Sequence, residues 1–319
     1  MNKKNAVTIK PYERTEYAYD KLRVCRKCGS YTVLSQKVCP ACGKRTLTDV
    51  PSAAKREVRR SMQSERLFAV LLALLAMFFA DTIPWMAISA AAGLLLTAML
   101  WVVQRRTTEA QIRIRTDRMF ARDQNRIRHG MIQDIKAAEG LLEARPALAY
   151  EMLREVNTLL RNDPIRNLQA ELLQTFVLRR DMDLLLEPLI MDGFSPHLAG
   201  YIGEVAKLNR ELIKESAIRY CLRYEPQIRG MHRGEDILAA VAGAAVRMKR
   251  YIELYPEFIR RYTYKLPAER LERLREVISQ HPGSFEQLKL EAEAVHRLRF
   301  GGRDSHASSN EGGQGGSSW

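Results

Sequence analysis

Uncharged positions form one long block from Leu67 to Val103, and a single charged residue, Asp81, interrupts it. An unbroken helix over this block would be about 55 Å long, whereas the hydrocarbon core of a bilayer is about 30 Å thick. Asp81 opens the segment Asp81-Thr82-Ile83-Pro84, in which the proline cannot continue a helix in register. The pattern therefore predicts a transmembrane helical hairpin over residues 67–103.

The two expected membrane helices differ in length. The second has about the length needed to span, and Trp85 and Trp101 mark its ends as an aromatic belt does. The first has a shorter uncharged stretch, so we expect it to begin near Met62, with Glu65 and Arg66 reaching toward water. A re-entrant hairpin stays open as an alternative, and a buried hairpin of a soluble domain is disfavoured because neither run has a polar face.

Helical periodicity returns after the hairpin. Residues 104–128 continue the second membrane helix as a basic stalk helix, and residues 51–66 before the hairpin form a basic juxtamembrane helix. Apolar residues at spacings of three and four then predict an all-α cytoplasmic domain over residues 129–300, either a bundle or an α-solenoid. The expected runs are 165–179, 181–191, 197–224, 233–254, 268–280 and 284–299, the last with a capping box of Ser284 and Gln287.

The two ends of the chain lack this periodicity. Residues 301–319 are rich in Gly and Ser and have too few apolar residues to fold, which predicts a disordered tail. We expect residues 1–20 to form a flexible N-terminal arm.

Four cysteines in the N-terminal part form two matched pairs, Cys25 with Cys28 and Cys39 with Cys42. A two-residue gap lets both thiolates of a pair bind one ion from a tight turn, and a glycine follows each second cysteine. Four soft ligands suit a structural Zn²⁺ site with no open position for water, and iron is the main alternative. Disulfides are disfavoured because the flanking charges predict a reducing cytoplasm, and a redox motif because no βαβ pattern surrounds it.

The duplicated Cys-x-x-Cys-Gly pattern resembles the zinc-ribbon (rubredoxin-like knuckle) family over about residues 23–46. The resemblance implies a small domain with short β-strands, and the segments 31–34 and 44–47 suit such strands. We place the zinc ribbon at residues 21–50.

The charge distribution gives an orientation. Lys and Arg residues flank the hairpin on both sides in the sequence, and the loop between its helices contains none. The positive-inside rule therefore predicts a two-pass protein of the cytoplasmic (inner) membrane, bacterial in type, with both termini in the cytoplasm.

The net charge of +14 is also unevenly placed. Residues 1–66 carry 16 basic and 6 acidic side chains, residues 104–128 carry 8 and 3, and residues 129–319 carry 27 of each. The basic excess therefore borders the expected membrane, where anionic lipid headgroups are its natural partner. The basic residues around the cysteines could also contact nucleic acid phosphates, although no aromatic stacking platform accompanies them.

No catalytic motif appears in the sequence. The six histidines are dispersed, and there is no phosphate-binding glycine loop, HExxH motif or G-x-S-x-G motif. The segment 232–236 is best interpreted as the acidic start of a helix, Ser195 as a helix cap, and Cys221 as a small buried hydrophobe.

These observations predict a non-enzymatic, membrane-anchored adaptor that faces the cytoplasm. It would bind a protein partner through its helical domain, its zinc ribbon or both. The alternative is a membrane-tethered nucleic-acid-binding protein that acts through the basic ribbon arm.

Overall fold

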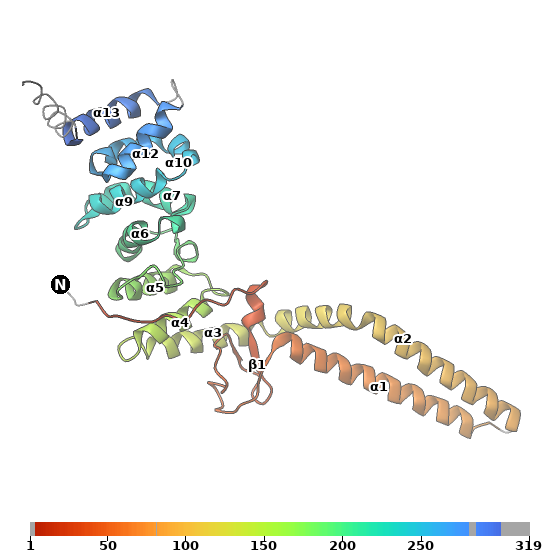
Figure 1. Ribbon diagram of the computed structural model, residues 1–319. Coiled ribbons are helices and arrows are strands. Elements are labelled where there is room, and N and C mark those ends of the chain that lie inside the picture. Colours follow the sequence, from red (N-terminus) through yellow and green to blue (C-terminus); the bar gives the residue numbers. More distant parts are fainter. Residues whose placement is uncertain (1–3, 81, 281–284, 301–319) are drawn as a thin grey trace, which may run out of the picture. The chain divides into compact units, whose positions relative to one another are not determined.

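The computed structural model describes residues 4–80, 82–280 and 285–300, and within them the chain is mostly helical with one small β-sheet (Figure 1). It divides into two compact units. The ribbon–hairpin unit consists of Glu13–Arg145 and Met152–Leu160, and the helical unit of Met1–Tyr12, Pro146–Glu151 and Arg161–Trp319.

The sheet of the ribbon–hairpin unit has three short antiparallel strands in the order β2-β1-β3. They are β1 (Arg23–Cys25), β2 (Tyr31–Thr32) and β3 (Leu47–Asp49), after the 3-10 turn η1 (Ala18–Lys21). The predicted strand at 31–34 corresponds to β2, and the one at 44–47 begins three residues later than expected. The central strand β1, which ends in the first cysteine, had no recognisable pattern in the sequence because it is only three residues long.

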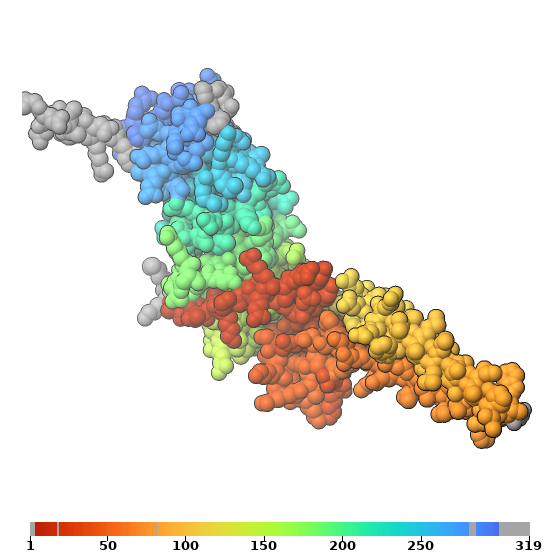
Figure 2. Space-filling model, turned by 45° about the vertical axis from the view of Figure 1, so that its right-hand side comes forward, coloured from red at the N-terminus to blue at the C-terminus, as the bar shows by residue number. Residues whose placement is uncertain are grey.

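The hairpin consists of α1 (Val50–Phe78) and α2 (Ile83–Arg122), which lie against each other along their length (Figure 2). The predicted juxtamembrane helix lies within α1. The predicted stalk continues α2 only to Arg122, because the helix ends at Asp123 and residues 124–128 begin the next helix. At the closest approach, a Cβ added to Gly93 would lie 2.5 Å from the Cβ of Ala73, so a glycine is required there. Both helices are long and apolar enough to cross a membrane.

A buried glutamine joins the two hairpin helices below the apolar region. Gln104 on α2 is 3% exposed, and its amide donates to a carboxylate oxygen of Glu65 at 2.9 Å. Its side-chain oxygen accepts a hydrogen bond from Arg66 at 2.6 Å. Glu65 and Arg66 were expected to reach toward water. Both instead form hydrogen bonds with Gln104 on α2.

The helical unit is built from short helices that follow one another in a stack (Figure 1). Each of α5, α6, α9, α11 and α13 packs against the next, as in a solenoid. The bounds are α4 (Pro146–Val156), α5 (Asp163–Thr175), α6 (Pro196–Leu208), α7 (Glu215–Arg223), α8 (Glu225–Arg229), α9 (Gly234–Ala245), α10 (Lys249–Leu254), α11 (Pro256–Tyr262), α12 (Ala268–Ser279) and α13 (Glu286–Phe300), with 3-10 turns η2 (Glu187–Leu189), η3 (Arg210–Leu212) and η4 (Thr263–Lys265).

The helix predicted at 181–191 is wrong, since only η2 is helical there. Met182, Leu184 and Leu186 are buried while the residues between them are partly exposed, which is the alternation of an extended chain. Pro188 lies near the start of η2, and it has no N–H to donate to the hydrogen bonds of a longer helix that would pass through it. The leucines that suggested a helix therefore pack from an extended segment.

Two of the predicted long helices are interrupted. The run at 197–224 contains α6, η3 and α7, and the run at 233–254 contains α9 and α10. The side chain of Asn209 accepts a hydrogen bond from the backbone N–H of Glu211, which stabilises the turn after α6. Apolar spacing continued across both breaks, so periodicity alone did not reveal them.

The N-terminal segment 4–12 hydrogen-bonds along the helical unit, where its residues lie over the first helices of the stack (Figure 2). Asn5 pairs with Phe176 in a parallel bridge, and the backbone N–H of Tyr12 donates to Asp183 at 2.7 Å. Lys4 forms an ion pair with Glu204. This segment was predicted to lie within a flexible arm.

Three predictions fall outside the described residues. They are the part of the hairpin turn at Asp81, the capping box at Ser284 and the Gly/Ser tail at 301–319.

Candidate metal centre

The structure brings the four predicted cysteines together beside the sheet. The Sγ atoms of Cys25, Cys28, Cys39 and Cys42 all lie within 4.8 Å of one another. The Sγ atoms of Cys25 and Cys42 are 3.6 Å apart, and so are those of Cys28 and Cys39. These distances exclude disulfides, in which the two sulfurs lie about 2 Å apart.

The two cysteine turns have the same backbone geometry. Gly29 and Gly43 have φ values of 72° and 68°, as the sequence predicts, and each donates its N–H to the carbonyl of the first cysteine at 2.9 Å. The N–H of that first cysteine in turn hydrogen-bonds beyond the glycine, to the carbonyl of Ser30 or Lys44 at 2.9 Å. Each pair of thiols is thus held by a tight turn that only a glycine completes without strain.

The spacing of the sulfurs fits a tetrahedral ion. Four thiolates about 2.3 Å from a zinc ion lie about 3.8 Å from one another, close to the observed separations. Cys25 and Cys39 are buried and Cys28 is exposed, so the set lies at the edge of the ribbon. The donor set of four thiolates without a further group suits a closed structural site rather than one that activates water.

Hydrogen bonds favour the thiolate form of Cys25. Burial alone would raise the pKa of its thiol, but the N–H groups of Cys28 and Lys27 and the hydroxyl of Thr46 lower it to about 6. The Oγ1 atom of Thr46 lies 3.0 Å from Cys25 Sγ. The deprotonated sulfur is the form that binds a metal ion, whereas burial raises the pKa of the Cys39 thiol to about 12, so Cys39 would have to release a proton on metal binding.

The ribbon lies on helix α3 (Gln124–Glu139), which follows α2 directly. A Cβ added to Gly130 of α3 would lie 2.1 Å from the carbonyl oxygen of Tyr31, so a glycine alone permits this contact. β3 leads into α1 without a linker, and α3, which packs on β2, follows α2 after Asp123.

Two aspartates of the same region hold strand β2 in place. Asp134 is fully buried, and its carboxylate accepts hydrogen bonds from the hydroxyl of Thr32 at 2.9 Å and the N–H of Val33 at 3.0 Å. Burial raises the pKa of Asp134 to about 6. Asp123, between α2 and α3, accepts a hydrogen bond from the hydroxyl of Tyr31 at 2.8 Å.

A hydrogen bond and charge from Arg122 lower the pKa of Asp123. The two aspartates therefore differ in electrostatic environment although both contact β2. Neither was singled out in the sequence, because single acidic residues on a basic helix carry no pattern.

The remaining residues singled out in the sequence have structural positions. Cys221 is fully buried on α7, and burial raises the pKa of its thiol to about 12. Ser195 caps α6 by accepting a hydrogen bond from the N–H of Leu198. Glu235 and Asp236 lie in the first turn of α9, as the acidic start of a helix.

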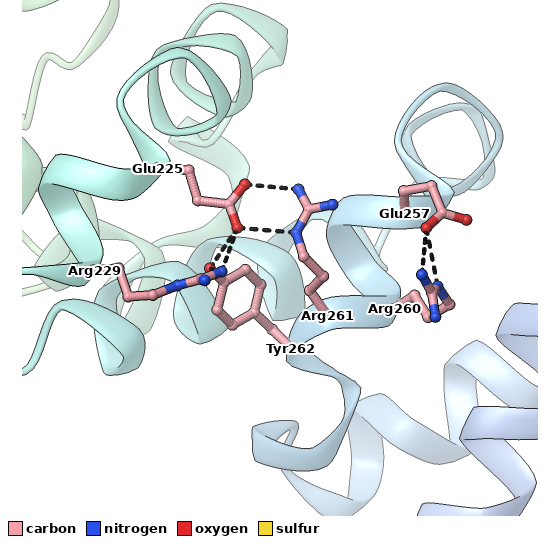
Figure 3. Close-up of polar contacts among 6 residues, drawn as sticks. All are labelled: Glu225, Arg229, Glu257, Arg260, Arg261 and Tyr262. Atoms are coloured by element: carbon pink, nitrogen blue, oxygen red, sulfur yellow. Dashed lines mark hydrogen bonds and ion pairs between the residues drawn. The ribbon is translucent and has the colours of Figure 1, made fainter.

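Glu225 lies at the centre of a polar cluster in the helical unit that no sequence pattern predicted (Figure 3). The carboxylate of Glu225 on α8 accepts two hydrogen bonds from Arg261 of α11, at 2.9 and 2.6 Å, and one from the hydroxyl of Tyr262 at 2.7 Å. Arg229 adds a fourth at 2.9 Å. Burial would raise the pKa of Glu225, but Arg261 and Tyr262 outweigh it and hold that pKa below its usual value.

This cluster joins helix α8 to helix α11 through hydrogen bonds and ion pairs. Both oxygens of the carboxylate already accept hydrogen bonds. Arg261 and Tyr262 lie 36 and 37 positions from Glu225 along the chain, so no local motif could reveal their contact with it.

Comparison with models of protein families, with characterised proteins and with solved structures finds no match to this chain.

Proposed function

We propose that this protein is a membrane-anchored adaptor whose metal-bound ribbon and helical unit face the cytoplasm and bind a protein partner. The observation that carries the proposal is the direct attachment of a cysteine-bound ribbon to the base of an apolar helical hairpin. A ribbon that is continuous with α1 and packs on the helix after α2 would be held close to the membrane surface. Such a module can present a docking surface to a partner.

The exposure of the hairpin supports membrane insertion. In the most apolar 18-residue window of each helix, only 11% of α1 and 0% of α2 is buried within the chain. A core helix of a soluble protein would bury most of that window, whereas lipid satisfies an apolar surface of this kind. Leu94, Leu95 and Phe78 are each at least 70% exposed.

The charges next to the hairpin support the cytoplasmic orientation. Arg105, Arg106 and Arg113 follow the apolar part of α2, and Arg59 and Arg60 precede that of α1. Basic residues at an anionic lipid surface contribute about 1 kcal/mol each, and positive flanks stay on the cytoplasmic side.

Zinc is the metal that the site fits best, since four thiolates in a small ribbon without an open position form a structural zinc centre. In this role Cys25, Cys28, Cys39 and Cys42 would hold the ion, which would supply folding energy to the ribbon rather than chemistry. No redox or hydrolytic step is assigned to it.

The anchoring half of the proposal is tested by alkaline carbonate extraction and by reporter fusions at residue 50 and after residue 300. We expect the protein to stay in the membrane pellet, with a fluorescent reporter active and a phosphatase reporter inactive at both positions. Release into the soluble fraction, or phosphatase activity at either position, would contradict it.

A second function has a specific observation in its favour. Arg26, Lys27, Lys37, Lys44 and Arg45 are exposed and form no ion pair among the described residues, so the ribbon presents uncompensated positive charge. A membrane-tethered nucleic-acid-binding role predicts steeply salt-dependent binding of RNA or DNA by the full-length protein. That binding would be lost in the variant R26Q/K27Q/K44Q, and flat binding curves at low salt would exclude it.

A further inference from the structure

The helical unit contains a hollow of about 590 Å³ along one side of α9. Its floor consists of small side chains of α9, and residues of α6, η3, η4 and α12 enclose it. We call this hollow the α9 groove and define it by its floor, Ala239, Ala240, Gly243 and Ala244. Alanine and glycine keep the floor low, so another backbone can come close to α9.

Positive charge surrounds the α9 groove. Lys207 and Arg210 at the end of α6 and Arg270 on α12 line it, and none of the three forms an ion pair within the described part of the chain. Residues 129–319 carry 27 basic and 27 acidic side chains, so an unpaired cationic rim is a local departure from neutrality.

One end of the groove is closed by paired charges. Asp236 lies between Arg233 and Lys265, at 3.2 and 3.3 Å, and Lys265 also contacts Glu235 at 2.8 Å. Arg233 has a φ of 59°, the left-handed conformation that favours glycine, because the turn between α8 and α9 is tight. This end therefore contributes little free charge, and the three unpaired cations define the recognition chemistry.

We propose that the α9 groove binds an acidic segment of a protein partner, with small or aliphatic side chains on the floor and carboxylates against Lys207, Arg210 and Arg270. This inference rests on the proposed adaptor function and specifies the partner's chemistry. A cationic rim over an apolar floor is complementary to an amphipathic acidic peptide, whose two faces satisfy both surfaces.

The lining argues against nucleic acid as the occupant. None of its residues is aromatic, so the groove offers no stacking surface for bases. All four floor positions are apolar and small, and a phosphate backbone would bury charge against them without a partner. The backbone polar groups of a peptide placed there can form hydrogen bonds within the peptide or with water.

The test uses the full-length protein in its native membranes, with a photo-reactive phenylalanine analogue in place of Ala240. We expect ultraviolet light to form a crosslink to one protein, and mass spectrometry to place it within a segment of net negative charge. Arg161 lies on the exposed surface of the same unit, away from the groove, and the analogue there serves as the control position. Crosslinking at Ala240 that does not exceed this control would overturn the inference, as would crosslinks to RNA or lipid.

A charge variant gives an independent measurement. K207Q/R210Q/R270Q should lower the amount of crosslinked partner at least tenfold, while R161Q/R180Q/R223Q removes three unpaired exposed charges elsewhere in the unit and should change it less than twofold. Equal losses in both variants would refute recognition by the groove. Thermal unfolding of both variants should match that of the parent protein, since the replaced side chains are at least partly exposed.

The two proposals fail in different ways. If a partner copurifies with the protein but its yield is unaffected by K207Q/R210Q/R270Q, the adaptor function stands and the groove assignment is wrong. If no protein partner copurifies at all, the adaptor function itself is wrong.

Discussion

The hydroxyl of Thr32 on strand β2 donates a hydrogen bond of 2.9 Å to the carboxylate of Asp134 on helix α3. This contact joins two segments 102 positions apart in the chain and holds the cysteine ribbon on the helix that follows the hairpin. Because Asp134 is fully buried, the ribbon and helix must assemble together for the carboxylate to find its partners.

The environment of Asp134 predicts a measurable titration. Burial raises its pKa to about 6, whereas the hydrogen bond from Arg122 lowers the pKa of Asp123. A carboxyl ¹³C titration of the full-length protein in micelles should therefore show the two aspartates on opposite sides of the usual value. A pKa near 4 for Asp134 would contradict the burial of its carboxyl group.

The same shift predicts how stability changes with pH. The folded-state pKa of Asp134 lies above its unfolded value, so the folded state binds the proton more tightly. The contribution of Asp134 to the free energy of unfolding is therefore fully present below about pH 4 and declines as the pH rises toward 6. The stability of the parent protein relative to D134N should fall by about 3 kcal/mol over this range. Both proteins retain the four cysteines, so metal release affects them alike, and a flat difference would refute the assignment.

Replacement of Gly130 by alanine should displace the ribbon. The added Cβ would lie 2.1 Å from the carbonyl oxygen of Tyr31, and overpacking of this kind costs about 1–3 kcal/mol. The measurement is the guanidinium concentration at the midpoint of unfolding in micelles. The release of bound metal is the signal that reports unfolding. Gly140 on the same chain segment is the matched control, since its added Cβ would have no neighbour closer than 3.6 Å. Equal midpoints for G130A and G140A would contradict the contact.

Metal binding should depend on the four clustered cysteines alone. C39S/C42S removes two of the four thiolates, so the protein should lose one equivalent of metal. The ribbon should then lose the folding energy that metal binding supplies. Elemental analysis and limited proteolysis of residues 26–46 report both effects. C221S changes a cysteine of the helical unit and should keep the full equivalent. A doubly substituted protein that retains its metal and resists proteolysis would disprove a metal centre here.

The Glu225 cluster should stabilise the helical unit. E225Q removes the charge that Arg261 and Arg229 contact, and we expect a loss of about 1–3 kcal/mol in denaturant unfolding at pH 7. Glu257 pairs with Arg260 at the surface, so E257Q is the matched control and should have a much smaller effect (Figure 3). The folded pKa of Glu225 is depressed, so its contribution is present above the unfolded value near pH 4.5 and disappears as the pH falls. A loss that is independent of pH would exclude the charged contact.

The features that the sequence predicts share a local cause. The positive φ of Gly29 and Gly43 follows from a short turn in which each glycine comes directly after a cysteine pair. Ser195 likewise caps a helix that begins at the next residue. Each of these signals lies within a few positions of the structure that it determines.

The features that the sequence missed depend on distant residues. Asp134 finds Thr32, Glu225 finds Arg261 and Asn5 pairs with Phe176 only after the chain has folded. The incorrect helix at 181–191 has the same origin, since tertiary packing buried alternate leucines from an extended chain.

The most direct test of the account is purification of the full-length protein from its native membranes in mild detergent, with nuclease treatment, followed by mass spectrometry. The proposed adaptor function predicts a protein partner in near-stoichiometric amount that survives the nuclease and is depleted by K207Q/R210Q/R270Q. Recovery without any protein partner, or recovery dominated by nuclease-sensitive material, would contradict it.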